Sequence, residues 1–208
     1  MKNDPIFLFR FSNKFEFSGK YGKDLMKEVS RYALVAAQIA KSKEHDVIHA
    51  HDWLAYPAGI AAKEISGKPL VAHIHATEFD RSGESVNKPV YDIERAGMHA
   101  ADHVVAVSHL TRKVVIEKYG VHPDKVSVLH NAVLDASIIK SDTRKHVPEK
   151  IVTFLGRITF QKGPEYFVEA AKKVIDKDPN VRFVMAGNGD LLNRMIERVA
   201  ELGMGTKF

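Results

Sequence analysis

Phe154-Leu-Gly-Arg-Ile-Thr-Phe-Gln-Lys-Gly-Pro164 is the stretch from which the fold of this 208-residue chain can be read. The apolar run at residues 151–155 predicts a buried strand. Pro164 suits the first turn of a helix, where its missing N–H costs nothing. Between strand and helix lie Arg157 and Lys162. A basic loop before a helix N-terminus favours phosphate, so the stretch predicts a diphosphate clamp; the alternative is a strand–loop–helix unit with two solvated cations.

The rest of the chain alternates between apolar strand patterns and helical periodicity. The pattern predicts strands at residues 6–9, 46–50, 69–74, 103–107, 126–129, 151–155 and 181–186, and helices at 24–41, 54–66, 90–101, 109–119, 164–176 and 190–202. Residues 11–23 and 77–87 show neither pattern and are expected to be irregular. Nearly continuous apolar strands that alternate with helices predict an α/β fold, with a parallel sheet covered by helices on both faces.

Residues 134–150 differ in composition from what precedes and follows them. They are rich in serine and charged residues and include Pro148, which is typical of a linker or exposed crossover. The sequence therefore predicts a first domain at residues 1–133, a linker at 134–150 and the start of a second domain at 151–208.

Composition limits the class of protein. Hydrophobic residues make up 45% and charged residues 27%, as in a soluble globular chain. Bases alternate with acids and the net charge is only +5, which argues against nucleic acid as a partner. No cysteine is present, so disulfides and thiol chemistry are excluded. No signal peptide or membrane span is apparent, and a cytoplasmic location is expected.

Polar residues follow the predicted strands at their C-terminal ends. In parallel sheets ligands bind beyond those ends, so the loops are expected to share one cleft. The candidate residues are Asp52, His75, Asp80, Arg81, Ser108, Asn131, Arg157, Lys162, Gly163, Gly187, Asn188 and Gly189.

Six short motifs occur in a fixed order along nearly the whole chain. They are Val47-Ile-His-Ala-His-Asp-Trp53, His73-Ile-His-Ala-Thr-Glu-Phe-Asp-Arg-Ser-Gly83, Ala101-Asp-His-Val-Val-Ala-Val-Ser108, Val128-Leu-His-Asn-Ala132, Gly156-Arg-x4-Lys-Gly163 and Ala186-Gly-Asn-Gly-Asp190. In this combination the chain resembles the retaining, nucleotide-sugar-dependent glycosyltransferases that include glycogen synthase and starch synthase.

The resemblance implies a GT-B fold, in which an acceptor-side Rossmann-like domain faces a second, donor-side one. It implies that Arg157, Lys162 and Gly163 bind the donor diphosphate, and that His75 is catalytic and lies near the transferred sugar. No metal or separate cofactor is implied; the co-substrate would be a nucleoside diphosphate sugar of UDP or ADP type. The resemblance also implies two further sets of candidate residues. The candidates on the acceptor side or in the cleft are Asp52, Asp80, Arg81, Ser108 and Asn131, and those in the loop beside the donor are Gly187, Asn188 and Gly189.

The implied reaction is transfer of a hexose, glucose in the first instance, to a hydroxyl acceptor such as a glucan. The anomeric configuration would be retained, and departure of the diphosphate would leave an oxocarbenium-like centre that needs no protein nucleophile. Glu78 and Glu94 are accordingly expected to be ordinary surface or helix carboxylates.

Measured against the family pattern, the chain is expected to lack both ends of the complete enzyme. The family's first strand with its glycine-rich loop has no counterpart here, nor does its later motif of two glutamates. We therefore expect the chain alone to be poorly stable and to have little transferase activity.

Three alternatives remain. His49 and His51, like His73 and His75, are two positions apart, and a strand would point each pair to one face, as a zinc site requires. The family pattern accounts for these positions without a metal. The chain could also be a non-catalytic nucleotide-binding module, or a nucleotide-sugar epimerase of the same fold.

Overall fold

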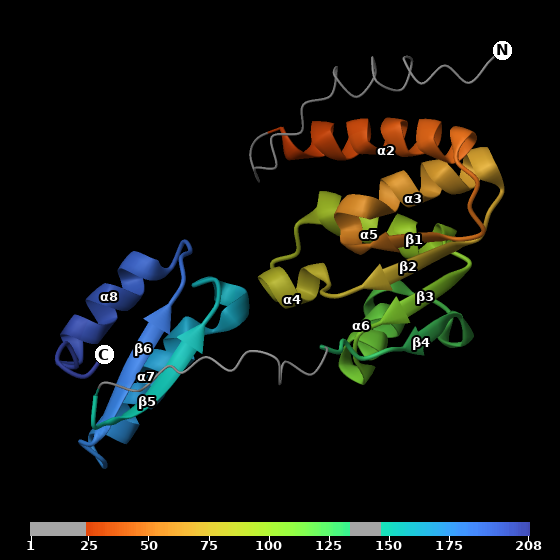
Figure 1. Cartoon of the computed structure of the whole chain (residues 1–208). Coiled ribbons are helices and arrows are strands. Elements are labelled where there is room, and N and C mark those ends of the chain that lie inside the picture. Colours follow the sequence, from red (N-terminus) through yellow and green to blue (C-terminus); the bar gives the residue numbers. More distant parts are fainter. Residues whose placement is uncertain (1–23, 134–146) are drawn as a thin grey trace. The chain divides into compact units, whose positions relative to one another are not determined.

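The computed structural model describes residues 24–133 and 147–208. The chain divides into two compact units, Met1–Ala132 and Val133–Phe208, and each is considered by itself (Figure 1). The strand expected at 6–9, the irregular segment at 11–23 and most of the linker at 134–150 lie outside the described residues.

The first unit is built on a four-stranded parallel sheet with the strand order β1-β2-β3-β4 (Figure 1). The strands are β1 (Ile48–His51), β2 (Leu70–Ile74), β3 (His103–Ala106) and β4 (Val126–Val128). The helices are α2 (Leu25–Ser42), α3 (Asp52–Ser66), α4 (Glu78–Ser82), α5 (Lys88–Ala100) and α6 (His109–Tyr119), and a short 3-10 turn, η1 (Pro123–Lys125), precedes β4.

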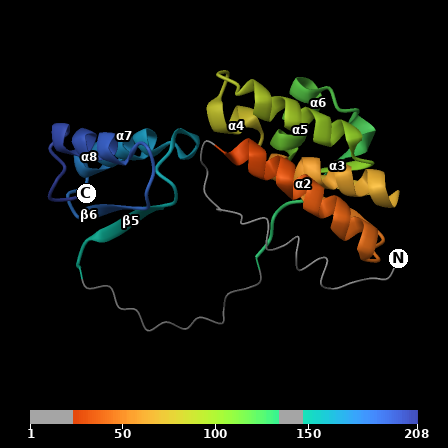
Figure 2. The ribbon, with the colours of Figure 1, turned by 90° about the horizontal axis from the view of Figure 1, so that it is seen from above.

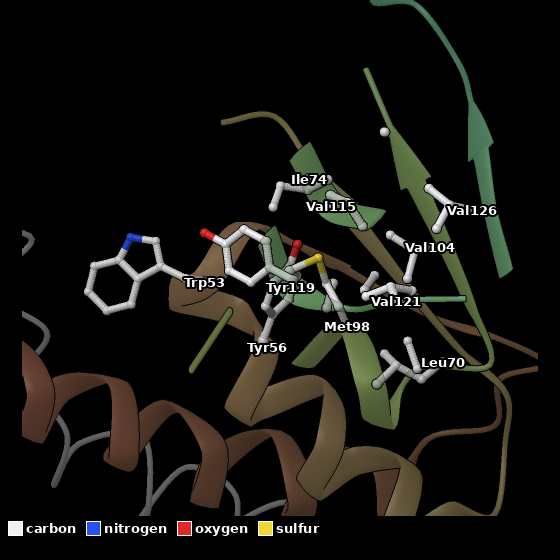
Figure 3. Close-up of a cluster of buried hydrophobic side chains, with 14 of the residues drawn as sticks. Trp53, Tyr56, Leu70, Ile74, Met98, Val104, Val115, Tyr119, Val121 and Val126 are labelled. Carbon is white, nitrogen blue, oxygen red and sulfur yellow. The ribbon is translucent and has the colours of Figure 1, made fainter. Parts of the chain in front are cut away.

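The core of this unit lies on one face of the sheet. Strand residues that alternate along β1 to β4 point to this face, and they pack against Tyr56 of α3, Met98 of α5 and Tyr119 of α6 (Figure 3). Helices were expected on both faces, but the core formed by the described residues covers only one. The reason is the strand order: right-handed crossovers between successive neighbouring strands all pass on the same side of the sheet.

Helix ends follow local chemistry. Ser108 caps α6 by accepting a hydrogen bond from the backbone N–H of Thr111, and Gly67 and Gly120 end α3 and α6 in the left-handed conformation. The expectation of an irregular segment at 77–87 is wrong for residues 78–82, because Thr77 and Asp80 form a capping box that starts α4, and it is confirmed for residues 83–87. None of the helices in the described ranges is both long and apolar enough to cross a membrane.

The second unit pairs two parallel strands, β5 (Lys150–Leu155) and β6 (Val181–Ala186), with α7 (Pro164–Ile175) and α8 (Leu192–Glu201). Figure 2 shows both helices on the same side of the strand pair, where Phe183, Val168 and Met195 form a separate core. The prediction that β5 is buried is wrong within the described residues, since Leu155 is 84% exposed. A central strand needs a neighbour on each edge, and here β5 has only β6.

Glu149 anchors the start of β5 by charge. Its carboxylate accepts hydrogen bonds from Arg182 at 2.9 Å and Lys207 at 3.3 Å. The pKa of Glu149 is lowered to about 2, first by a hydrogen bond from its own backbone N–H and then by Arg182 and Lys207. Because the pKa is lower in the folded state, this carboxylate stabilises the unit above its unfolded pKa near 4.5, and that contribution is lost as the pH falls through about 2.

Replacement of Arg182 by alanine should therefore raise the pKa of Glu149. The measurement is an NMR titration of the Glu149 carboxyl carbon in the folded chain. Arg194→Ala is the control, because Arg194 pairs with Glu165 instead. An unchanged Glu149 pKa in the Arg182 variant would contradict the assignment.

Candidate functional site

The basic loop of the second unit follows β5 and leads into α7. Its short 3-10 helix η2 (Phe160–Lys162) is followed by Gly163, whose φ of 61° lies in the left-handed region. Gly163 is the N-cap of α7 and offers no side chain to the first backbone N–H groups of that helix. Arg157 and Lys162 are both exposed, and the loop from 156 to 163 contains no acidic residue. Cations and uncapped N–H groups therefore lie on one short segment, as an anion requires.

Arg157 is held by its own loop. Its Nη2 donates to Gln161 Oε1 at 3.2 Å, a neutral acceptor that leaves the guanidinium charge uncompensated. Lys162 makes no ion pair within the described residues. Both side chains thus keep their charge available for a ligand.

The glycine loop after β6 lies directly against the basic loop. The backbone N–H of Gly156 donates to Ala186 O at 3.1 Å, and that of Ile158 donates to Asn188 O at 2.9 Å. A Cβ added to Gly187 would lie 1.8 Å from Gly156 O, and one added to Gly189 would lie 2.2 Å from Ile158 O. The two loops, predicted separately from sequence, form one continuous backbone surface that only glycine permits.

At the first unit's sheet edge, Asp52 connects the ends of β1 and β2. Its φ of 59° is the one positive value for a non-glycine residue in the described residues. The left-handed conformation costs energy but is tolerated by aspartate. Asp52 Oδ1 accepts a hydrogen bond from the backbone N–H of His75 at 2.8 Å, and His51 Nδ1 lies 2.9 Å from His75 Nε2. Asp52 thus positions the segment that carries His75. Helix α3 begins at Asp52, two residues before the predicted start at residue 54.

The other acceptor-side candidates have local roles. Asp80 Oδ2 accepts from Thr77 N at 2.6 Å as part of the capping box, and Ser108 caps α6. Asn131 is exposed after β4. All three follow strands of one parallel sheet and lie towards its C-terminal edge, so a role in acceptor binding stays a prediction.

Arg81 belongs to a buried ionic network. It donates to Glu78 Oε2 at 3.1 Å, to Ala76 O at 2.9 Å and, through Nη2, to Glu94. Glu94 is fully buried and also accepts from the Tyr119 hydroxyl and from Glu78 N. Burial, together with the neighbouring Glu94 carboxylate, raises the pKa of Tyr119, which keeps its hydroxyl protonated as a donor.

Glu78 and Glu94 were expected to be ordinary surface or helix carboxylates. Both lie in helices, but neither is on the surface: Glu78 is 5% exposed and Glu94 is 0% exposed. A signal for Glu94 was present, because Val90, Glu94 and Met98 recur every four residues and share the buried stripe of α5. The carboxylate of Glu78 is bonded by Arg81 and Ser82, three and four residues later in α4, but the sequence pattern did not predict that helix.

Four imidazoles gather where β1 and β2 end. His51 lies beside His73 in the parallel register, and His49 Nε2 is 3.2 Å from His73 Nδ1. One nitrogen from each of His49, His51 and His73 lies within 4.8 Å of the others, a spacing that could hold a metal ion. The structure thus brings together the two histidine pairs noted in the sequence.

Two family descriptions together match nearly the whole chain. Residues 20–135 match Glycosyltransferase Family 4, and residues 135–208 match Glycosyl transferases group 1. The boundary between the matches falls close to the boundary between the two compact units.

Curated relatives share the sequence over most of this chain. An uncharacterized glycosyltransferase, MJ1607, of Methanocaldococcus jannaschii is 30% identical over 178 residues, which cover 79% of this chain and 45% of the relative. A UDP-Gal:alpha-D-GlcNAc-diphosphoundecaprenol alpha-1,3-galactosyltransferase of Escherichia coli is 28% identical, covering 82% of this chain and 46% of the relative. The chain spans less than half the length of these relatives.

Solved structures show the same architecture. The crystal structure of Anabaena Alr3699/HepE in complex with UDP-glucose superposes with a TM-score of 0.64 at 20% identity, covering 85% of this chain and 50% of that one. This likeness confirms the expected α/β class with parallel sheets.

Proposed function

This chain belongs to glycosyltransferase family 4, and on that premise we propose that it forms part of an enzyme that transfers a hexose from a nucleoside diphosphate sugar to a hydroxyl. The observation that carries the proposal is the segment from Arg157 to Pro164, where two exposed cations precede the uncapped N-terminus of α7. A diphosphate needs cations and N–H donors on one short surface, and this segment supplies both.

In the proposed mechanism the basic loop binds the donor diphosphate. Arg157 and Lys162 neutralise charge that accumulates on the diphosphate as the bond to the sugar breaks, which is the electrostatic term that most lowers such barriers. The glycine loop at residues 187–189 keeps the basic loop in place through its backbone contacts with Gly156 and Ile158. The sugar–phosphate bond breaks, its electron pair stays on the diphosphate, and the sugar becomes an oxocarbenium-like centre. The acceptor hydroxyl attacks on the same face and its proton passes to the departing diphosphate, so the configuration is retained.

His75 is the proposed catalytic residue on the acceptor side. Its backbone is held by Asp52 and its ring by His51, which limits the freedom of the side chain. The buried network of Arg81 and Glu94 fixes the helix that begins three residues after it. A positioned imidazole can bind sugar hydroxyls or transfer a proton.

The donor is proposed to be UDP-glucose or a related UDP-sugar. This rests on the E. coli relative, whose name specifies a UDP-galactose donor, and on the HepE structure, which was solved with UDP-glucose. ADP-glucose and a glucan acceptor remain within the proposal, because M. tuberculosis glycogen synthase is a further relative at 25% identity.

The test is calorimetric titration of UDP, ADP and GDP into the chain in the absence of added metal. The Arg157→Ala/Lys162→Ala double variant should weaken binding of the preferred nucleotide by at least about 100-fold, because two charge-assisted contacts of roughly 1.5–3 kcal/mol each are lost. Lys173→Ala/Lys177→Ala is the matched control: it removes two exposed cations from the same unit but outside the loop, and it should bind as the parent does.

Equal binding by the parent and the Arg157/Lys162 variant would contradict the clamp.

The two other candidate functions predict different outcomes with UDP-glucose. An epimerase converts the nucleotide sugar with no acceptor present, and a non-catalytic module binds it without turnover. NMR of the anomeric proton distinguishes both from retaining transfer.

A further inference from the structure

The histidine cluster on β1 and β2 lies on the sheet face opposite to the hydrophobic core. Side chains alternate along a strand, and Ala50, Ala72 and Ile74 occupy the core face, so His49 and His73 point the other way. The rings are stacked: His49 and His73 centroids are 5.3 Å apart with an interplanar angle of 5°, and those of His73 and His75 are 4.4 Å apart at 19°. Four neighbouring imidazoles repel one another when protonated, so their gathering on one sheet face needs an explanation.

We propose that His49, His51 and His73 bind one divalent transition-metal ion, with zinc as the representative ion. Each ring offers a nitrogen, and the three nitrogens lie within 4.8 Å of one another. The 3.2 Å between His49 Nε2 and His73 Nδ1 is close to the edge of a tetrahedron around zinc, which is about 3.3 Å for Zn–N bonds of about 2.0 Å. Small rotations of the two exposed rings, His49 and His51, would close the site on the fixed ring of His73.

His73 is the buried member of the set. It is 7% exposed, and its Nδ1 faces His49 Nε2, so this ring offers Nδ1 to the ion from a position that packing holds in place.

The ligand set determines the class of ion. Three imidazoles with no carboxylate favour zinc, copper or nickel over magnesium and calcium, which prefer oxygen. Three protein ligands leave a fourth position open. A metal here would tie β1 to β2 and fix His51, the neighbour of His75, so it would stabilise this edge of the sheet. In the sequence, the absence of cysteine and the family pattern weighed against a metal; the shared face and the closeness of the three nitrogens now favour one.

The experiment is calorimetric titration of zinc chloride into the chain after treatment with a chelator and dialysis. We expect one zinc ion per chain. His49→Ala/His51→Ala should weaken binding by at least about 100-fold, since even loss of an outer-shell partner costs roughly 10–100-fold. The variant keeps the buried His73, so the fold should persist, and the fluorescence of Trp53 checks this. Cobalt should give the absorption bands of a tetrahedral site in the parent and not in this variant.

His109→Ala/His130→Ala is the matched control, because these rings form another histidine pair, 5.9 Å apart, outside the cluster. It should bind zinc as the parent does. Absence of zinc binding by the folded parent overturns the proposal, and so does binding that survives in the His49/His51 variant or is lost equally in the control. Nucleotide binding by Arg157 and Lys162 is measured separately, so failure of one proposal leaves the other intact.

Discussion

Replacement of Glu94 by alanine is expected to lower the free energy of unfolding of the first unit by about 3–5 kcal/mol. Glu94 is fully buried, and its carboxylate receives Arg81, the Tyr119 hydroxyl and Glu78 N. Without it the guanidinium loses a buried counter-charge, and a hydroxyl and a backbone N–H lose their acceptor. Breaking one side of such a pair costs far more than the intact pair contributes.

Urea unfolding followed by Trp53 fluorescence measures this effect. Trp53 is the single tryptophan of the chain and is buried in the first unit, so its signal reports that unit alone. Glu117→Ala is the control: its carboxylate is exposed and lies 4.0 Å from Lys113, so the expected cost is below about 1 kcal/mol. A Glu94 variant no less stable than the Glu117 variant would show that the network contributes little.

Two further variants separate charge from hydrogen bonding. Glu94→Gln keeps an acceptor for Tyr119 but loses the charge that faces Arg81, so its stability should lie between the parent and Glu94→Ala. In Arg81→Ala/Glu94→Ala the guanidinium is removed together with the carboxylate it faces, so neither charge is left behind and the double variant should lose less stability than the sum of the two single changes.

Replacement of Gly187 by alanine is expected to destabilise the second unit by roughly 3 kcal/mol or more. The φ of Gly187 is 154°, a region that side chains avoid, and an added Cβ would lie 1.8 Å from Gly156 O. The blocking atom belongs to the backbone, so no rotamer change relieves the clash. The loops after β5 and β6 would have to separate.

Hydrogen exchange in peptides that cover β5 and β6 measures this change, because the second unit contains no tryptophan. Gly205→Ala is the matched control: it lies in the same unit, and a Cβ there would meet nothing within 4 Å. Equal protection in both variants would show that the close approach of Gly187 to Gly156 is not needed. On the proposed function, Gly187→Ala should also weaken UDP binding, because the basic loop rests on Gly187.

Much of the fold was predictable because it depends on local chemistry. Each helix and strand within the described residues was expected within about two residues of its bounds, except α4 and the brief turns η1 and η2. Alternation of apolar strands and periodic helices favours parallel pairing, and the parallel pairs β1–β2, β2–β3 and β3–β4 confirm it. Ser108, Gly67 and Gly120 end helices as their capping chemistry predicts.

The candidate site was predictable in part, because strand ends in a parallel sheet meet at one edge. This places Arg157 beside the loop at residues 187–189, and His75 beside Asp52. Exposure was less predictable: β5 has the composition of a buried strand, yet within the described residues it has one neighbour and one covering layer.

The sequence by itself determined the class of fold, the order of its elements and the family, since these depend on periodicity, turn residues and short motifs. Only the tertiary structure decided the partners of Glu94, which come from α4 and α6, and the shared face of His49, His51 and His73. The physical reason is that a buried charge or a metal site depends on groups brought together by folding. Strand register and helix packing set their spacing, and no local pattern encodes it.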